Sequence, residues 1–375
     1  MRNAAVYLLA IVFLSSGGNL LIAQIHEPEG LNMSGSWDGW TNPPDVLSLA
    51  SSSQQTGGEI TRRAMGTAHY HTTIQVAASG GDITGGTYDW LFTSGPTDGY
   101  SNNKWANTTV VINTIQEYTH QGGSNNSATL TNGKWYTVNF EDKEYVNTNA
   151  VFMETSAEPV TFSGLTFSPN SDIKPWETVT VTLTASAAPC AEENVFLRYS
   201  TASNFTNSTL VEFSFTGTAG TAQIPNFDAG TTVYFYAFSS TFDAASIDPN
   251  FDMLTINYIN NSGSNYSYSV ITPTTYETVT NGNFNEGATW VGGGVPPSGS
   301  HLSVSDALVL NTDYIASGIT INSGGNLSFS AAETLTVESF GQWTNDGAFT
   351  AGNGAVKLES DVAVGGSVIS TFNNV

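Results

Sequence analysis

The sequence predicts an all-β protein, and three observations support that prediction. From residue 30 onward, polar residues alternate with apolar ones or flank short apolar runs rich in Val, Thr, Tyr and Phe. Gly, Asn, Ser or Pro interrupts these runs about every eight to twelve residues. Apolar residues at helical spacing are almost absent. We therefore expect two β-sandwiches followed by the start of a right-handed parallel β-solenoid.

Residues 1–23 are expected to form a secretory signal peptide. Arg2 carries the only early positive charge, the apolar run AAVYLLAIVFL follows, and cleavage is expected after Ala23. The run is too short to span a bilayer, and the alternative is a retained N-terminal anchor. We therefore predict a secreted or cell-surface protein without membrane insertion after signal cleavage.

Residues 24–155 are predicted to form the first sandwich, of seven or eight strands. The strand-like runs are YHTTIQVA, GTYDWLF, TTVVINTI, SATLTNGKWYTVNF and NAVFMET. Residues 156–272 hold a second set of runs, including TVTVTLTAS, NVFLRYST, TTVYFYAFSS and MLTINYI. Their number and hairpin signals suit an immunoglobulin-like or fibronectin-like sandwich.

Residues 273–375 repeat two or three alternating apolar residues followed by a Gly or Asn turn, which is typical of stacked solenoid rungs. Four or five rungs are expected. No capping element is evident at the end, so we expect this parallel β-helix to continue past Val375. The residues expected to point inward are Ile319, Ile321, Leu327, Phe329, Leu335, Val337, Phe349, Val356 and Leu358.

Charge and cysteine content restrict the partners. Acidic residues outnumber basic ones by 32 to 9, and the net charge is −23. Nucleic acid and anionic membrane surfaces would repel such a chain, whereas a neutral polysaccharide would not. Cys190 is the single cysteine, which excludes an internal disulfide.

The stretch GSWDGWTNPP places two indoles, Trp37 and Trp40, in a turn among Asp38, Asn42 and Asp45. A surface indole offers a flat apolar plate that matches the C–H face of a pyranose ring. Neighbouring carboxylates and amides can bond the sugar hydroxyls. This turn therefore indicates a sugar-binding site, with Trp37 as a plug of the sandwich end as the alternative.

The order of GSWDGW, YHTTIQVAASGGDITGGTYDWLF and GPTDGYSNNKW resembles that of starch- and glycogen-binding modules, which are small β-sandwiches. The resemblance implies α-glucan or related polysaccharide binding by a platform of two indoles, Trp40 and Trp105. Asp89 stands where the family usually has lysine, and Lys104 is the expected substitute. The resemblance, with the turn itself, gives these expected carbohydrate contacts: Trp40, Trp105, Lys104, Asp89, Asn42, Asn103 and Trp37.

In two other aromatic stretches, burial in the core is the first interpretation. Tyr88, Trp90 and Phe92 share one side of a strand, which is typical of a buried row. Trp135 and Tyr136 fall on opposite faces of a late strand, so one of them is expected at the surface or an edge.

The whole succession of modules is similar to secreted multidomain proteins of Bacteroidetes, and TWVGGGVPP is similar to the entry into G8-type surface β-helices. Such chains often carry a sorting domain for type IX secretion, which is not recognised in this sequence.

No enzyme site is expected. The solenoid acids are scattered, and only His301 and Lys357 stand near them as candidate bases. No cofactor or metal is predicted, because His69 and His71 lack a third ligand nearby and His120 lies apart. Calcium in FDAASIDPNFD, through Asp243, Asp248 and Asp252, is left as an alternative.

Two functions follow from these observations. The first is a non-catalytic carbohydrate-binding protein, with the targeting part of a longer chain as one form of this role. The second is a structural adhesin whose sandwiches are spacers and whose solenoid contacts a cell or a protein partner.

Overall fold

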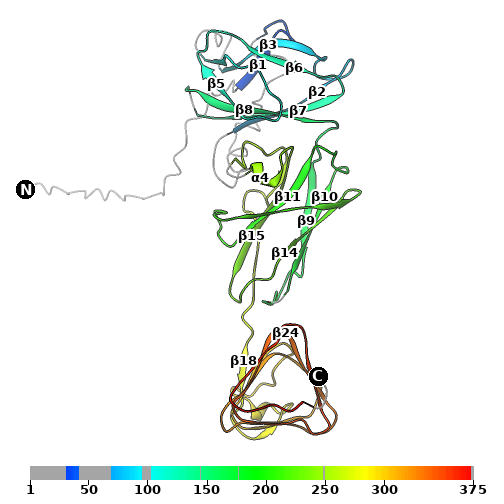
Figure 1. Ribbon diagram of the computed structural model, residues 1–375, viewed down its shortest axis with the longest axis vertical. Coiled ribbons are helices and arrows are strands. Elements are labelled where there is room, and N and C mark those ends of the chain that lie inside the picture. The colour runs from blue at the N-terminus through cyan, green and yellow to red at the C-terminus, as the bar shows by residue number, and fades with distance from the viewer. Residues whose placement is uncertain are drawn as a thin grey trace, which may run out of the picture.

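The computed structural model describes residues 31–41, 69–94, 103–143, 145–175, 177–247 and 250–372. It confirms the predicted fold class, since 50% of the described residues are strand and 2% are helix. Two sandwich-like bodies and a solenoid follow one another along the long axis, with the solenoid drawn end-on as a triangle (Figure 1).

The first sandwich is one sheet that curves round its own core. Its strand order is β1-β3-β4-β5-β8-β7-β2, and β6 pairs with β3. The strands are β1 (Leu31–Gly35), β2 (His69–Val76), β3 (Gly86–Ser94), β4 (Lys104–Ala106), β5 (Gln116–His120), β6 (Asn126–Leu130), β7 (Lys134–Glu141) and β8 (Thr148–Thr155).

One expected strand is absent from this sandwich. Within TTVVINTI only an isolated bridge forms, between Thr109 and Ser127. The Gln116 amide bonds the backbone on both sides of Val110, and Asn113 takes a positive φ of 55°. Side-chain bonds to the backbone and a left-handed residue thus replace the strand, although Val110 still packs against the core.

The second sandwich has two sheets, of orders β13-β14-β10-β9 and β12-β11-β15-β16, with β17 also on β15. Only the end of MLTINYI is strand, because Leu254 and Ile256 are buried in a loop against the first sandwich. The elements are β9 (Phe162–Ser168), β10 (Val179–Ala185), β11 (Asn194–Ser200), β12 (Thr209–Glu212), β13 (Ser214–Thr216), β14 (Ala219–Ile224), β15 (Thr232–Ser240), α4 (Ala244–Ile247), β16 (Tyr258–Ile259) and β17 (Tyr266–Ser269).

The solenoid has two parallel sheets, of orders β18-β20-β22-β24-β26, with β27 also on β24, and β19-β21-β23-β25. Its elements are β18 (Thr275–Glu277), β19 (Gly282–Asn283), η1 (Gly287–Thr289), β20 (His301–Val304), β21 (Ala307–Leu310), β22 (Tyr314–Ile321), β23 (Asn326–Phe329), β24 (Thr334–Asn345), β25 (Ala348–Thr350), β26 (Ala355–Leu358) and β27 (Ala363–Gly365).

All nine residues expected inside the solenoid lie in its core or pack against it. The expectation of four or five rungs was wrong, because there are about three turns. Long turns explain the difference: one rung runs from Thr320 to its register partner Thr344.

The two ends of the solenoid differ. At the first rung, Trp290 is buried against Phe284 and donates its indole N–H to the Phe284 carbonyl at 2.8 Å. At the last rung, Phe372 packs on Trp343, with ring centroids 5.1 Å apart. Val364 continues the inward column of Trp343, yet 57% of it is exposed. The chain between β27 and Phe372 therefore folds back over the last rung and covers it only in part.

A hydrophobic cluster joins the two sandwiches. Val151 and Met153 on the outer face of β8 pack with Phe238, Met253 and other residues of the second sandwich. Asn139 of β7 adds polar contacts, because its amide donates to the carbonyls of Met253 and Thr255 at 2.8 and 2.7 Å. The first sandwich thus sits on the end of the second through a buried surface.

The second sandwich meets the solenoid through a much smaller contact. The linker is held near its start, where Ile271 donates its N–H to the Ile173 carbonyl at 2.8 Å. Next to Ile173, the Lys174 ammonium lies 2.6 Å from a carboxylate oxygen of Glu338, at the solenoid corner facing the sandwich. An ion pair therefore spans this junction.

Candidate functional site

The turn after β1 is held by hydrogen bonds within the turn. Trp40 has a positive φ of 69°, and its backbone N–H donates to the Gly35 carbonyl at 2.8 Å. One Asp38 oxygen accepts from the backbone N–H of Gly35 and of Trp40. Burial raises the pKa of Asp38, while these backbone donors lower it. This oxygen, Oδ1, is committed to the turn, whereas Oδ2 is buried without a hydrogen-bond partner.

Trp37 closes the end of the first sandwich, as the alternative for it predicted. Its ring stacks on Trp90 at 5.8 Å and meets Tyr88 edge-on at 5.5 Å. Its indole N–H donates to the Met33 carbonyl at 3.1 Å. Trp40 is also half-buried.

The two-indole platform expected from the resemblance was wrong. Trp105 is 0% exposed, and its indole N–H donates to the Val146 carbonyl at 2.8 Å. Three core rings separate it from Trp37 in an unbroken row of contacts. The row runs from Trp37 through Trp90, Phe92 and Phe140 to Trp105, with successive centroids 5.8, 4.6, 4.8 and 5.3 Å apart. Because Trp105 is fully buried, it offers no open ring face to a ligand beside Trp40, its expected partner in the platform.

The polar residues predicted around that platform do not gather either. Lys104 precedes Trp105 on β4, so strand alternation points its side chain to the other face of the sheet. Asp89 is exposed beside Ser36, whose hydroxyl accepts from its backbone N–H. Asn103 is half-buried, and its carbonyl accepts from Ser94. Asn42 lies outside the described residues.

Tyr145 explains why Trp105 is covered. Its ring lies nearly parallel to the Trp105 indole, at 6.2 Å and 16°, and 5.9 Å from the His120 ring. Burial lowers the pKa of His120. Tyr145 belongs to the loop between β7 and β8. Because a loop has no strand periodicity, the sequence did not predict that Tyr145 would lie over Trp105. Trp135 is half-buried and Tyr136 is buried, as the split between strand faces predicted.

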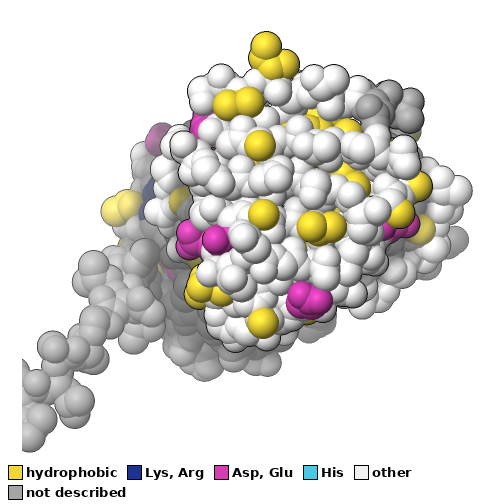
Figure 2. Space-filling model, turned by 90° about the horizontal axis from the view of Figure 1, so that it is seen from below, with side chains coloured by type: hydrophobic (Ala, Val, Ile, Leu, Met, Phe, Trp, Pro, Cys, Tyr) yellow, Lys and Arg dark blue, Asp and Glu magenta, His cyan; other side chains and the backbone are white. Residues whose placement is uncertain are grey.

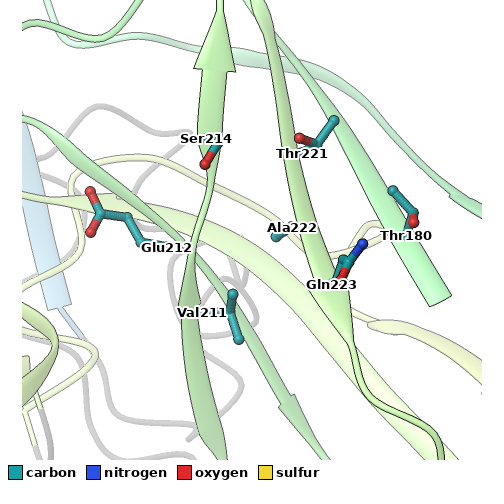
Figure 3. Close-up of a pocket in the computed structure, with 7 residues that line it drawn as sticks. All are labelled: Thr180, Val211, Glu212, Ser214, Thr221, Ala222 and Gln223. Atoms are coloured by element: carbon teal, nitrogen blue, oxygen red, sulfur yellow. The ribbon is translucent and has the colours of Figure 1, made fainter. Parts of the chain in front are cut away.

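The second sandwich carries a groove that sequence reasoning missed. It has a volume of about 290 Å³ and opens where the chain leaves β12 of one sheet to enter β13 of the other. Figure 3 shows Gln223 and Thr180 close together on one side, with Val211 and Ser214 across from them. We call this the second-sandwich groove, and its lining is Thr180, Val211, Glu212, Ser214, Thr221, Ala222 and Gln223.

A smaller hollow of about 190 Å³ shares Glu212 with this groove. Glu193 and the half-buried Cys190 are among its lining residues. Burial raises the pKa of Glu193, although the Val160 N–H, which donates to it at 3.0 Å, opposes that rise. Glu193 thus belongs to the end of the second sandwich that meets the first sandwich.

The solenoid acids remain scattered and bond locally. Asp346 accepts from Ser367, Glu333 from Ser330, and Asp313 from the Thr334 N–H. His301 lies across Gly318 of the next rung and bonds Thr320 at 2.9 Å. A β-carbon on Gly318 would come within 2.6 Å of the His301 ring, so a larger residue there would have to displace that ring.

Among the described residues, no group of three or more His, Cys, Asp or Glu side chains is placed to hold a metal ion. Asp243 is used locally, since it accepts from the Ser246 N–H at 2.9 Å. Asp248, a member of the alternative calcium loop, lies outside the described residues.

Comparison with known proteins identified no relative. No family model, curated protein or solved structure matches the chain. In the parts of the chain that the structure describes, there is no helix with the length and hydrophobicity needed to cross a bilayer. The functional argument therefore rests on geometry.

Proposed function

We propose that this protein is a secreted or cell-surface adhesin in which the two sandwiches form a stiff spacer and the solenoid makes the contact. One observation carries the proposal: the sandwiches share a buried hydrophobic cluster that includes Met153 and Phe238, both 0% exposed. Domain interfaces that are only polar permit relative motion, whereas a large buried apolar one restrains it.

The outer face of the solenoid suits a contact surface. Ser303, Thr320 and Thr344 follow one another in register on β20, β22 and β24, with their side chains outward. Seen from below, the molecule presents mainly uncharged polar surface with isolated hydrophobic and acidic side chains (Figure 2). Such a surface favours polar, wet recognition over burial of a single apolar patch.

Beads coated with the protein and washed over intact cells and immobilised extracellular proteins would test this role. Thr344→Arg places a bulky cation on the outer face and should reduce bead retention on the recognised surface by tenfold or more. Thr87→Arg is the matched control, because Thr87 is an exposed strand threonine of the first sandwich. Equal retention of Thr344→Arg would contradict a contact through this face, and no retention of the native protein would contradict the adhesive role.

A second proposed function is polysaccharide binding at Trp40 alone. The half-buried indole on a rigid left-handed turn favours it. Trp40→Ala should abolish retardation in gels containing α-glucan while leaving the thermal midpoint nearly unchanged. Unchanged retardation would contradict a site at this turn.

A further inference from the structure

The second-sandwich groove contains polar side chains that the fold itself does not use. Two threonine pairs of the first sandwich satisfy their hydroxyls across the sheet: Thr73 bonds Thr137 at 3.1 Å, and Thr87 bonds Thr129 at 3.0 Å. In the groove, two register pairs stand without any such bond to a described residue. These pairs are Thr180 with Gln223 and Ser214 with Thr221.

Glu212 adds a fifth polar group at the rim, also without a bonded partner among the described residues. Val211 and Ala222 supply apolar surface between these groups. Hydroxyl and amide side chains both donate and accept hydrogen bonds, as sugar hydroxyls do. Five uncommitted polar groups around a small apolar floor therefore match a polyhydroxylated ligand.

The lining also limits the charge and size of that ligand. It contains the Glu212 carboxylate and neither Lys nor Arg, so a sulfated, phosphorylated or uronic acid residue would meet an unfavourable field. A volume of about 290 Å³ is at the lower end of ligand pockets. It suits one sugar unit of a longer chain.

We infer that the second-sandwich groove is a binding site for a neutral saccharide. The site is independent of Trp40 and of the adhesive role of the solenoid. It arises because Phe213, buried in the core, carries the chain from β12 in one sheet to β13 in the other. Residues Ala222–Ile224 of β14 then extend past the end of β13, and the groove opens beside them.

The test is saturation-transfer NMR and calorimetry on the full chain with neutral hexaoses of glucose, mannose and xylose, an oligogalacturonate, and a basic extended peptide. At least one neutral oligomer should bind at millimolar concentration. Gln223→Ala and Glu212→Gln should each weaken it about fivefold, the effect of losing one hydrogen bond. Thr221→Trp, which fills the groove from an exposed strand position, should abolish binding.

Glu158→Gln is the matched control for charge, because Glu158 is exposed and does not line the groove. Three outcomes would overturn the inference: no neutral oligomer binds, the oligogalacturonate or the peptide binds in preference to all of them, or binding survives Thr221→Trp. Binding that survives Thr221→Trp but is lost in Trp40→Ala would assign the saccharide to the turn. Gln223→Ala keeps the test decisive if the tryptophan variant misfolds.

Discussion

The two junctions of this molecule have opposite chemistry. Between the sandwiches, Met153 and Phe238 belong to one buried apolar cluster, and Asn139 bonds two carbonyls across the boundary. Between the second sandwich and the solenoid, the Lys174–Glu338 ion pair spans a short linker. Salt screens partly exposed ion pairs and weakens them, whereas apolar burial has no charge to be screened. The comparison predicts one stiff joint and one that ionic conditions adjust.

The largest effect should come from a cavity in the stiff joint. Met153→Ala removes a fully buried side chain and should lower the free energy of unfolding by about 2–5 kcal/mol. Urea titrations followed by tryptophan fluorescence and by hydrogen exchange of β15 should show one transition in the native protein and two in the variant.

The control for this variant is Met33→Ala, in the core of the first sandwich away from the junction. It should lower the midpoint of unfolding while keeping the two probes coincident. Coincident probes in Met153→Ala would mean that this side chain does not couple the sandwiches.

A smaller loss is expected from Asn139→Ala. Its Oδ1 lies 2.7 Å from Nδ1 of His71, and its amide is committed to two carbonyls, so His71 must carry a proton on Nδ1. Removing the amide leaves buried carbonyls unpaired, which should cost about 1–3 kcal/mol. Asn149→Ala removes a peripheral bond to Glu141 and should cost less than about 0.5 kcal/mol. Similar losses in thermal unfolding would contradict a buried polar role for Asn139.

Lys174→Met should leave the unfolding free energy within about 1 kcal/mol of the native value, because partly exposed ion pairs contribute little. Its effect should appear instead in the geometry. Spin labels on the second sandwich and the solenoid should give a broader distance distribution, and about 1 M salt should broaden the native distribution likewise. Lys357→Met, which breaks an exposed pair with Glu359 inside the solenoid, should change nothing. A narrow distance distribution in Lys174→Met would show that the ion pair does not fix the orientation of the solenoid relative to the second sandwich.

The smallest effect is expected from pH, and in the solenoid it should come from His301. Burial lowers the pKa of His301 below the usual value of about 6.5. The unfolded chain then binds a proton that the folded chain excludes, so stability falls as pH drops from about 6.5 toward the folded pKa. Hydrogen exchange of β22 should accelerate in that window, and His301→Gln should abolish the change. Acceleration of β22 that persists in His301→Gln would assign the effect to other groups.

The alternation of apolar and polar residues predicted the fold well, because the buried residues of the strands follow it. The alternating positions from Ile319 to Leu358 lie inside the solenoid, and Trp90 lies in the core as its row of aromatic neighbours indicated. It failed where short-range polar contacts dominate. Asn113 and Gln116 divert TTVVINTI from the sheet, and nothing in local spacing reveals that diversion.

The candidate sites were harder to predict because they depend on contacts between distant segments. The sequence placed Trp40 and Trp105 in order along the chain, but pairing with Phe92 turned Trp105 into the core, and Tyr145 covered it. The second-sandwich groove needs Thr180 beside Gln223, and these two residues are 43 positions apart in the sequence. Scattered threonines and glutamines in a β-rich sequence look alike until the strand register is known.

The short linker between the second sandwich and the solenoid has a mechanical consequence. In Figure 1 a single run of backbone crosses that gap, so any pull on an anchored solenoid passes through residues 272–274. Under flow, the Lys174–Glu338 contact would separate first and let the solenoid swivel, and the joined sandwiches would follow as one lever. Sideways drag would thereby be converted into tension along the chain before any strand is torn from its sheet.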